Sequence, residues 1–376
     1  MSRRASVLPV AAAALLLGSS AFAAPHVGGR SYLVVSASGE TLLAHDADAR
    51  VPIASITKLM TVLVTREHTQ LDDVVTVEPE AAEVGAVPGN SSIHLETGER
   101  LTVRELIEGA LVQSADDAAV ALAQYVGQGS VAAFVGMMNA KARALGLAET
   151  HFANPDGLDA SGQYSSARDV TKLAEVLMRD PVVRSIVRLR VARISGRVLH
   201  TWNDLLSTFP GVIGVKTGHT SRAGWSEVAA ARGRSVTVYA TLLGEPSETA
   251  RDSDLAELLA WGLARYRVVP VVSTARVYAT AQVPWGKRPL ELVAAHDVVR
   301  VARVDRPLTE RVVAPGVVSL PVRAGERLGE VDVYDRGALV ARAPLVAGRS
   351  IAKPDLLGRV GWYVERTFHH VWSWVS

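Results

Sequence analysis

Hydrophobic positions recur every three or four residues in six segments of this 376-residue chain, a spacing that predicts amphipathic helices. The predicted helices run from Ile56 to Leu63, Val103 to Leu111, Asp116 to Tyr125, Val131 to Leu145, Ala167 to Leu177 and Thr249 to Tyr266. Shorter apolar runs predict strands, and two of them, Tyr32 to Val35 and Thr41 to Leu43, flank Ser38-Gly39 as a hairpin. A strand at Val236 to Leu243 is expected beside one at Val212 to Val215. This mixture predicts an α+β unit.

The hydrophobic pattern changes after Val269, where short Val-rich runs alternate with Gly and Pro turns. The predicted strands are Val271 to Ala279, Val298 to Val304, Val317 to Val322 and Leu328 to Tyr334. No strong helical pattern occurs between residues 271 and 346. This part of the chain is therefore expected to be a small all-β sandwich domain.

The N-terminus has the pattern of an export signal. Arg3 and Arg4 precede an apolar run from Val7 to Leu17, and Ala21-Phe22-Ala23 offers a small-residue cleavage site. The apolar run is too short for a membrane-spanning helix, which needs about 20 residues. We expect cleavage after Ala23 and a protein that acts on the periplasmic or outer side of the cytoplasmic membrane.

The C-terminal residues 354–376 predict an amphipathic helix. One helical stripe is apolar, and it consists of Leu356, Leu357, Val360, Val364, Phe368, Val371, Trp372 and Val375. Three of the seven Trp residues of the chain lie in this tail, and Trp favours the membrane interface. We expect the helix to lie in the membrane surface and anchor the protein peripherally. The alternative is a helix that packs on its own protein.

Composition excludes some classes of function. Removal of Arg3 and Arg4 lowers the formal charge from +2 to 0, so no basic field remains to attract nucleic acid. The chain has no Cys and therefore no disulfide. Its length suggests two domains besides the termini. The expected organisation is a signal peptide at 1–23, a catalytic domain at 24–268, the β domain at 269–347 and the tail helix at 354–376.

The first candidate for chemistry is Ser55-Ile56-Thr57-Lys58. Only six of the 40 basic residues are Lys, and a desolvated lysine can lose its proton where arginine stays charged. Residues i and i+3 share one helix face, so the Lys58 amine can reach the Ser55 hydroxyl and activate it as a nucleophile. A second copy, Ser350 to Lys353, is followed at once by Pro354, which stops a helix, and we interpret it as coincidental.

Two more motifs follow in the chain. Ser114-Ala115-Asp116 lies where one helical pattern yields to the next, and helix capping is the alternative explanation for its Ser and Asp. Lys216-Thr217-Gly218-His219 follows an apolar stretch, so it is expected on or at the end of a strand. Lys216 and Thr217 offer a cation and a hydroxyl to a carboxylate, and Gly218 permits close approach of a ligand.

The order Ser-Xaa-Xaa-Lys, a Ser-Xaa-Asn-like triplet, then Lys-Thr-Gly is the signature set of penicillin-binding proteins and serine β-lactamases. The segments around these motifs resemble those of the low-molecular-weight penicillin-binding proteins that are D-alanyl-D-alanine carboxypeptidases. The segments are 52–61, Asn154-Pro155-Asp156-Gly157-Leu158 and 216–224. The resemblance covers roughly residues 29 to 265, and in layout it extends to the β domain and the tail.

The resemblance implies roles for individual residues. Ser55 would attack the carbonyl between the last two D-alanines of a peptidoglycan stem peptide and form an acyl-enzyme. Lys58 would take the Ser55 proton, directly or through a relay that includes Ser114. The backbone amides of Ser55 and His219 would form the oxyanion hole. Lys216 and Thr217 would hold the terminal carboxylate of the substrate, and Gly218 would be a further substrate-binding residue.

The resemblance also implies a biological setting. β-Lactams would acylate Ser55, and the enzyme would serve peptidoglycan biosynthesis and cell shape. No metal or cofactor is implied.

Asp116 departs from the family pattern, which commonly has Asn in the second motif. An ionised Asp only accepts hydrogen bonds, whereas an Asn amide also donates. Asp116 can anchor Lys58, but its charge would favour the protonated lysine and oppose its work as a base. We predict either a buried charge balance with Lys216 or slower turnover.

Three alternatives remain at this stage. A β-lactamase shares the motifs, but the chain has no Glu-Xaa-Xaa-Leu-Asn segment of the kind that supplies the deacylating base in class A enzymes. A catalytically weak wall-binding protein is the non-enzyme alternative, and only Asp116 favours it. A D,D-endopeptidase that hydrolyses cross-links would use the same residues on a different bond.

Overall fold

The computed structural model describes residues 6–10, 23–286 and 288–355, and these residues divide into two compact units. One unit comprises residues 22–265, and the other comprises the chain from Tyr266 onward together with the N-terminal residues up to Ala21. The sequence predicted the division at 268/269, which falls within strand β11 (Tyr266–Val272) of the second unit.

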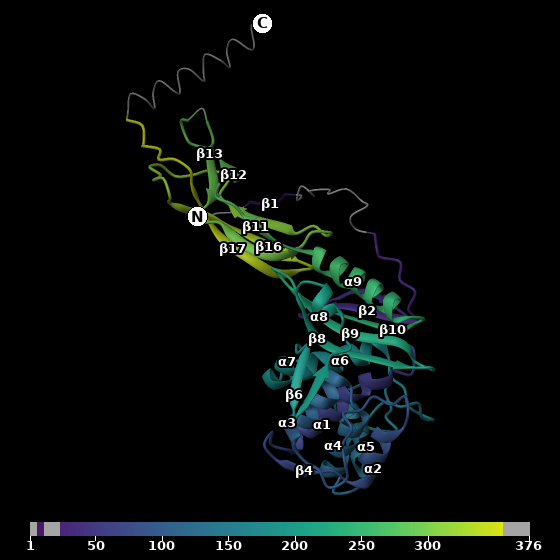
Figure 1. Cartoon of the computed structure of the whole chain (residues 1–376). Coiled ribbons are helices and arrows are strands. Elements are labelled where there is room, and N and C mark those ends of the chain that lie inside the picture. Colours follow the sequence, from purple (N-terminus) through teal and green to yellow (C-terminus); the bar gives the residue numbers. More distant parts are fainter. Residues whose placement is uncertain (1–5, 11–22, 287, 356–376) are drawn as a thin grey trace. The chain divides into compact units, whose positions relative to one another are not determined.

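The unit of residues 22–265 is built on a five-stranded antiparallel sheet in the order β3-β2-β10-β9-β8 (Figure 1). The strands are β2 (Ser31–Ser36), β3 (Thr41–His45), β8 (Val212–Thr220), β9 (Gly224–Arg232) and β10 (Thr237–Glu245). The predicted hairpin of β2 and β3 is confirmed. The expectation that the strands at 212 and 236 are neighbours is wrong, because β9 lies between them and pairs with both.

Side chains of the sheet alternate between two cores, as the period of a strand requires. Val238, Ala240 and Leu242 of β10 pack under α9 (Glu248–Ala264), which covers one face of the sheet (Figure 1). Tyr239 and Leu243 face the larger core under the other helices. The sheet is thus buried on both faces.

Helix α1 (Lys58–His68) runs through this larger core, and its first eight residues are buried. It contacts α4 (Asp116–Val126), α5 (Val131–Ala144) and α6 (Ala167–Leu177). The remaining helices are α2 (Pro79–Ala86), α3 (Val103–Glu108), α7 (Pro181–Ile186) and α8 (Leu205–Thr208). Two small antiparallel sheets complete the unit, β4 (Val74–Thr76) with β5 (Arg100–Thr102) and β6 (Val191–Ile194) with β7 (Arg197–His200).

The six predicted helices are present, and three of them differ from the prediction at an end. The first begins with a 3₁₀ turn, Ala54–Thr57, and becomes α-helical at Lys58. The segment predicted as one helix from Val103 to Leu111 is α3 followed by a π-helical turn, Gly109–Gln113. The last predicted helix ends at Ala264, since Tyr266 begins β11. Within the described residues no single helix is long and apolar enough to cross a membrane, although α4 and α5 meet the criterion jointly across an 89° bend.

The second unit is a β-sandwich, as predicted. A six-stranded sheet in the order β1-β15-β16-β17-β13-β12 shares one apolar core with the two-stranded sheet β11-β14. The strands besides β11 are β1 (Ser6–Val10), β12 (Val277–Ala281), β13 (Leu290–Ala294), β14 (Val298–Arg303), β15 (Thr309–Ala314), β16 (Arg327–Asp335) and β17 (Ala338–Ala347).

Two predicted strands of this unit need correction. Val271 to Ala279 is split between β11 and β12 by a turn, and Val317 to Val322 makes only isolated bridges at its two ends. Strand β1 belongs to the predicted signal peptide, so the mature chain expected from the sequence would lack it. Of the predicted tail helix, all but Pro354 and Asp355 lies outside the described residues.

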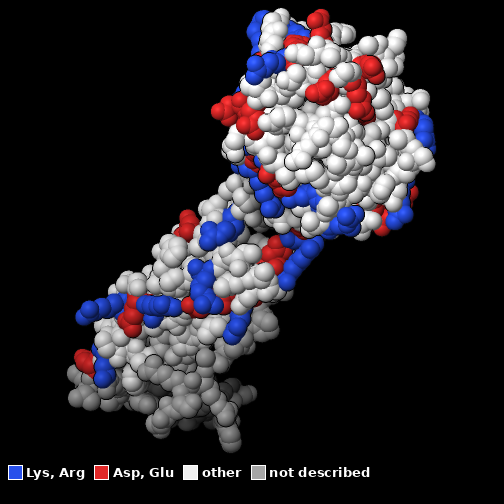
Figure 2. Space-filling model, turned by 90° about the horizontal axis from the view of Figure 1, so that it is seen from below, with Lys and Arg blue, Asp and Glu red and all other residues white. Residues whose placement is uncertain are grey.

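Figure 2 shows acidic and basic side chains interspersed on the visible face.

Candidate active site

Ser55 lies on a short 3₁₀ turn, Ala54–Thr57, that leads directly into α1 at Lys58. The sequence predicted a single helix through both residues, but Ala54 has a positive φ of 49°, which the first turn of a continuous α-helix does not allow. The predicted contact is nevertheless present, because Lys58 Nζ donates to Ser55 Oγ at 2.8 Å. The serine therefore lies at the N-terminal end of α1 with its candidate base beside it.

The Lys58 ammonium is fully buried and uses all three of its donors. Besides Ser55 it donates to Asp116 Oδ1 and to the backbone oxygen of Asp156, each at 2.6 Å. A lysine with three acceptors cannot rotate away without breaking hydrogen bonds in a water-poor environment. Its nitrogen is therefore fixed against the Ser55 hydroxyl.

Asp116, the first residue of α4, anchors Lys58 as predicted. Its second carboxylate oxygen accepts from Ser91 N at 3.1 Å, and its own N–H donates to Ser91 O at 2.7 Å. The loop at Ser91 thus holds the Asp116 carboxylate, which contacts the Lys58 ammonium within the core.

Ser114 does not cap α4, so the capping interpretation is wrong. The N-cap residue is Ala115, which makes no side-chain cap, and Ser114 ends the π-helical turn in a left-handed conformation with φ of 65°. This conformation directs the Ser114 hydroxyl to Lys216 Nζ, which donates to it at 2.9 Å. The hydrogen bonds of the described residues thus join Ser114 to Lys216 rather than to Lys58.

Lys216 lies within β8 and is almost fully buried. Burial, followed by the nearby charge of Lys58, holds the pKa of Lys216 well below its usual value of 10.5, and Asp116 offsets only part of this. The three groups therefore form one electrostatic unit. Asp116 raises the pKa of Lys216, which is the direction that a buried charge balance of these two residues requires.

Gly218 allows β8 to approach the Ser55 turn. A Cβ at this position would lie 2.7 Å from the Ile53 carbonyl oxygen, so only glycine fits. The next residue, His219, stacks its ring on Trp225 with the centroids 4.1 Å apart. Its imidazole is thereby occupied, as expected for a residue that would act through its backbone amide.

Comparison with known proteins supports the same family. A model of the D-alanyl-D-alanine carboxypeptidase family (Peptidase_S11) matches residues 19–247. The chain belongs to this family. The D-alanyl-D-alanine carboxypeptidase DacA of Escherichia coli K12 is 31% identical over 360 residues, which are 92% of this chain and 89% of that protein.

Solved structures of the family extend the match to three dimensions. Penicillin-binding protein 5 of Haemophilus influenzae is 28% identical, covers 88% of this chain and 99% of its own, and gives a TM-score of 0.65. The DD-transpeptidase of Streptomyces K15 is 34% identical, covers 64% of this chain and 98% of its own, and gives a TM-score of 0.61. The resemblance inferred from the three motifs and the predicted fold class are both confirmed.

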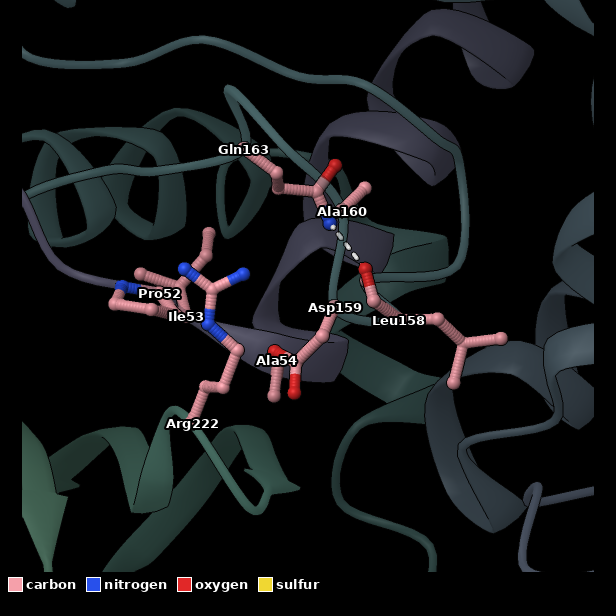
Figure 3. Close-up of a pocket in the computed structure, with 9 residues that line it drawn as sticks. Pro52, Ile53, Ala54, Leu158, Asp159, Ala160, Gln163 and Arg222 are labelled. Carbon is pink, nitrogen blue, oxygen red and sulfur yellow. Dashed lines mark hydrogen bonds between the residues drawn. The ribbon is translucent and has the colours of Figure 1, made fainter.

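The segment Asn154 to Leu158 lies beside the Ser55 turn, and the sequence assigned no role to it. Asp156 supplies a backbone acceptor to Lys58, and burial raises the pKa of its carboxyl above the usual 3.8. A small pocket flanks this contact (Figure 3). It is lined by Pro52, Ile53, Ala54, Gly157, Leu158, Asp159, Ala160, Gln163 and Arg222. Gln163 Nε2 donates to Leu158 O at 3.2 Å within it.

Two further charged residues near β8 escaped the sequence analysis. Glu227 of β9 and Arg251 of α9 are both buried, with Arg251 Nε 3.3 Å from Glu227 Oε2. Glu227 directly precedes a run of small apolar residues, Val228 to Ala231, and this position was the available signal in the sequence. A charge in such a strand requires a partner or a function.

The substitution Asp116→Asn tests the effect of the unusual carboxylate. The substitution removes the carboxylate charge that accepts from Lys58 Nζ at 2.6 Å and opposes the work of this lysine as a base. The value of kcat/KM at neutral pH is therefore expected to rise by about threefold to tenfold, a fraction of what general base catalysis contributes. D-alanine release measured from pH 5 to 10 provides the pH profile of kcat/KM. Superimposable profiles of the variant and the wild type would contradict this effect of Asp116.

Proposed function

We propose that this chain removes the terminal D-alanine from peptidoglycan stem peptides as a serine-type carboxypeptidase. The observation that carries the proposal is the 2.8 Å contact of Lys58 Nζ with Ser55 Oγ in a chain of this family. Ser55 Oγ attacks the carbonyl carbon between the last two D-alanines. Lys58 accepts the Ser55 proton as the uncharged amine and passes it to the leaving D-alanine amine, and water then hydrolyses the remaining ester and restores the Ser55 hydroxyl.

The proposal gives roles to the other residues of the site, and contacts support two of these roles. The backbone amides of Ser55 and His219 stabilise the oxyanion, since Gly218 lets β8 pack against the Ser55 turn. Lys216 and Thr217 hold the free carboxylate. The hydrogen bond from Lys216 Nζ to Ser114 Oγ supports a role for Ser114 in delivering the proton to the leaving amine.

β-Lactams are expected to acylate the same serine, because their strained amide presents a carbonyl and a carboxylate like those of the substrate. After the ring opens, the leaving nitrogen stays covalently attached to the acyl group and does not diffuse away, so the ester on Ser55 persists.

We further propose that the protein is exported and that residues 354–376 anchor it at the membrane surface, in line with the apolar stripe and the clustered Trp residues. Truncation after residue 350 is expected to release the protein from membranes into the soluble fraction after sedimentation. A truncated protein that still sediments with membranes would refute the anchor.

The activity is tested with residues 24–376 and two substrates. A stem peptide that ends in D-Ala-D-Ala should release free D-alanine, and the same peptide with a terminal L-Ala should not. A cross-linked dimeric muropeptide measures D,D-endopeptidase activity in parallel. Release of D-alanine from the stem peptide at the higher kcat/KM supports carboxypeptidase action, and faster cleavage of the cross-link would overturn it in favour of the endopeptidase.

A further inference from the structure

The most unusual group near the site is Glu227, whose side chain is fully buried on β9. Neither of its carboxyl oxygens has a hydrogen-bond partner. Its nearest cation, Arg251, already donates to Asp252 Oδ1 at 2.8 Å through Nε and approaches Glu248 Oε1 at 3.5 Å. The Arg251 charge is therefore shared among three carboxyl groups. Such a carboxyl group is costly to bury in its ionised form.

The position of Glu227 relates it to the carboxylate-binding strand. In the antiparallel pair of β8 and β9, Glu227 lies directly opposite Thr217. Directly opposed residues project from the same face of a sheet with neighbouring Cβ atoms. Thr217 belongs to the pair that we assign to the substrate carboxylate. Glu227 is therefore the acidic group directly beside one of the two residues that are to hold an anion.

Charged groups on several elements act electrostatically on Glu227. Lys216 lies on β8, Arg251 and Asp252 lie on α9, and Asp204 precedes α8. Glu248 of α9 contacts the same guanidinium, His219 of β8 is turned to Trp225, and on β10 the opposed residue is the apolar Leu242. Burial is the strongest influence and raises the pKa of Glu227 to about 8, while Arg251 lowers it in part.

We propose that Glu227 determines the affinity of the site for a free substrate carboxylate, because its uncharged form admits the anion beside Thr217 and its ionised form repels it. The inference rests on the proposed function, since it needs Lys216 and Thr217 to bind the carboxylate. It adds a specificity-determining residue that contacts neither Ser55 nor Lys58.

The proposal has a definite sign with pH. Below pH 8 Glu227 is mostly uncharged and adds no negative charge beside Thr217. Above pH 8 the ionised Glu227 adds a like charge on the Thr217 face of the sheet. Glu227 also raises the pKa of Lys216 when it is ionised. Its removal disfavours the charged lysine and would by itself lower the acylation rate, so a ratio that rises with pH reports the lost repulsion.

The experiment measures the second-order rate of Ser55 acylation by benzylpenicillin from pH 6.5 to 9.5. The proteins are the wild type, Glu227→Gln, Glu227→Leu and the control Glu248→Gln, which removes an acidic contact of Arg251 outside the sheet. The rate of Glu227→Gln divided by that of the wild type is expected to rise about tenfold across this range, as removal of one repulsion at short distance implies. The same ratio for Glu227→Leu should rise by a similar factor, and the ratio for Glu248→Gln should not change with pH.

Each other outcome has one meaning. For both Glu227 variants, a ratio of variant to wild-type acylation rate that stays constant or falls with rising pH would overturn the role of Glu227. This holds if near-ultraviolet circular dichroism shows a wild-type fold, and it would leave the proposed function intact. A rise for Glu248→Gln equal to that for Glu227→Gln would also overturn it, since the effect would then be general to the Arg251 cluster. Absence of acylation of the wild type at every pH would instead defeat the proposed function.

Discussion

Replacement of Lys58 by alanine is expected to lower kcat/KM for D-alanine release by about a thousandfold or more, within the range for loss of a general base. The Lys58 amine is the group within hydrogen-bond distance of Ser55 Oγ that can take its proton. The acylation rate with a β-lactam should fall by a similar factor, because both reactions begin with the same proton transfer. Steady-state kinetics and stopped-flow acylation measure the two rates.

Two controls separate this loss from damage to the fold. Lys58→Ala leaves Asp116 buried without its cation, which can cost about 3 to 5 kcal/mol of stability. The double variant Lys58→Ala with Asp116→Asn removes that unpaired charge and should be equally inactive but more stable. Lys353→Ala alters the second Ser-Xaa-Xaa-Lys copy, which lies outside any helix, and should be fully active. A folded double variant with near wild-type activity would contradict the role of Lys58.

Replacement of Gly157 by alanine is expected to lower kcat/KM by about a hundredfold, the scale of a displacement of about 1 Å at the reacting centre. A Cβ at Gly157 would lie 2.1 Å from the Ala54 carbonyl oxygen and 2.8 Å from Ser55 N. The turn that carries Ser55 must then move away from Asp156, whose backbone oxygen holds Lys58. Kinetics with thermal unfolding of the same samples would show the effect.

Gly98→Ala is the matched control for this substitution. Gly98 has a positive φ of 83°, and a Cβ there would meet nothing within 4 Å. Both variants carry the cost of alanine in a left-handed conformation, about 1 kcal/mol, but only Gly157→Ala adds the collision. Equal activities of the two variants would show that the contact between the Gly157 loop and the Ser55 turn is unimportant.

Several parts of the site were predictable because they depend on local spacing. The separation of three residues between Ser55 and Lys58 brings their side chains together in a 3₁₀ turn as in an α-helix, so the prediction survived an error in the helix type. The partnership of Lys58 with Asp116 followed from the order of the motifs in a known family. The strand position of Lys216 followed from the apolar residues before it.

Other parts depend on tertiary contacts that local patterns do not contain. Strand β9 was missed because its sequence is rich in alanine, which favours helices in isolation and fits a strand here only between two neighbours. The attachment of Ser114 to Lys216 depends on a left-handed residue after a π-helical turn. Glu227 gains its significance from the strand register opposite Thr217, which no local pattern shows.

The most direct test of the account is the intact mass of the protein after incubation with benzylpenicillin, followed by peptide mapping. We predict a mass increase of one penicilloyl group per chain, located on Ser55, and no increase for Ser55→Ala at the same folded concentration. Attachment to another residue, or an equal mass gain in Ser55→Ala, would contradict the assignment of Ser55 as the acylated nucleophile.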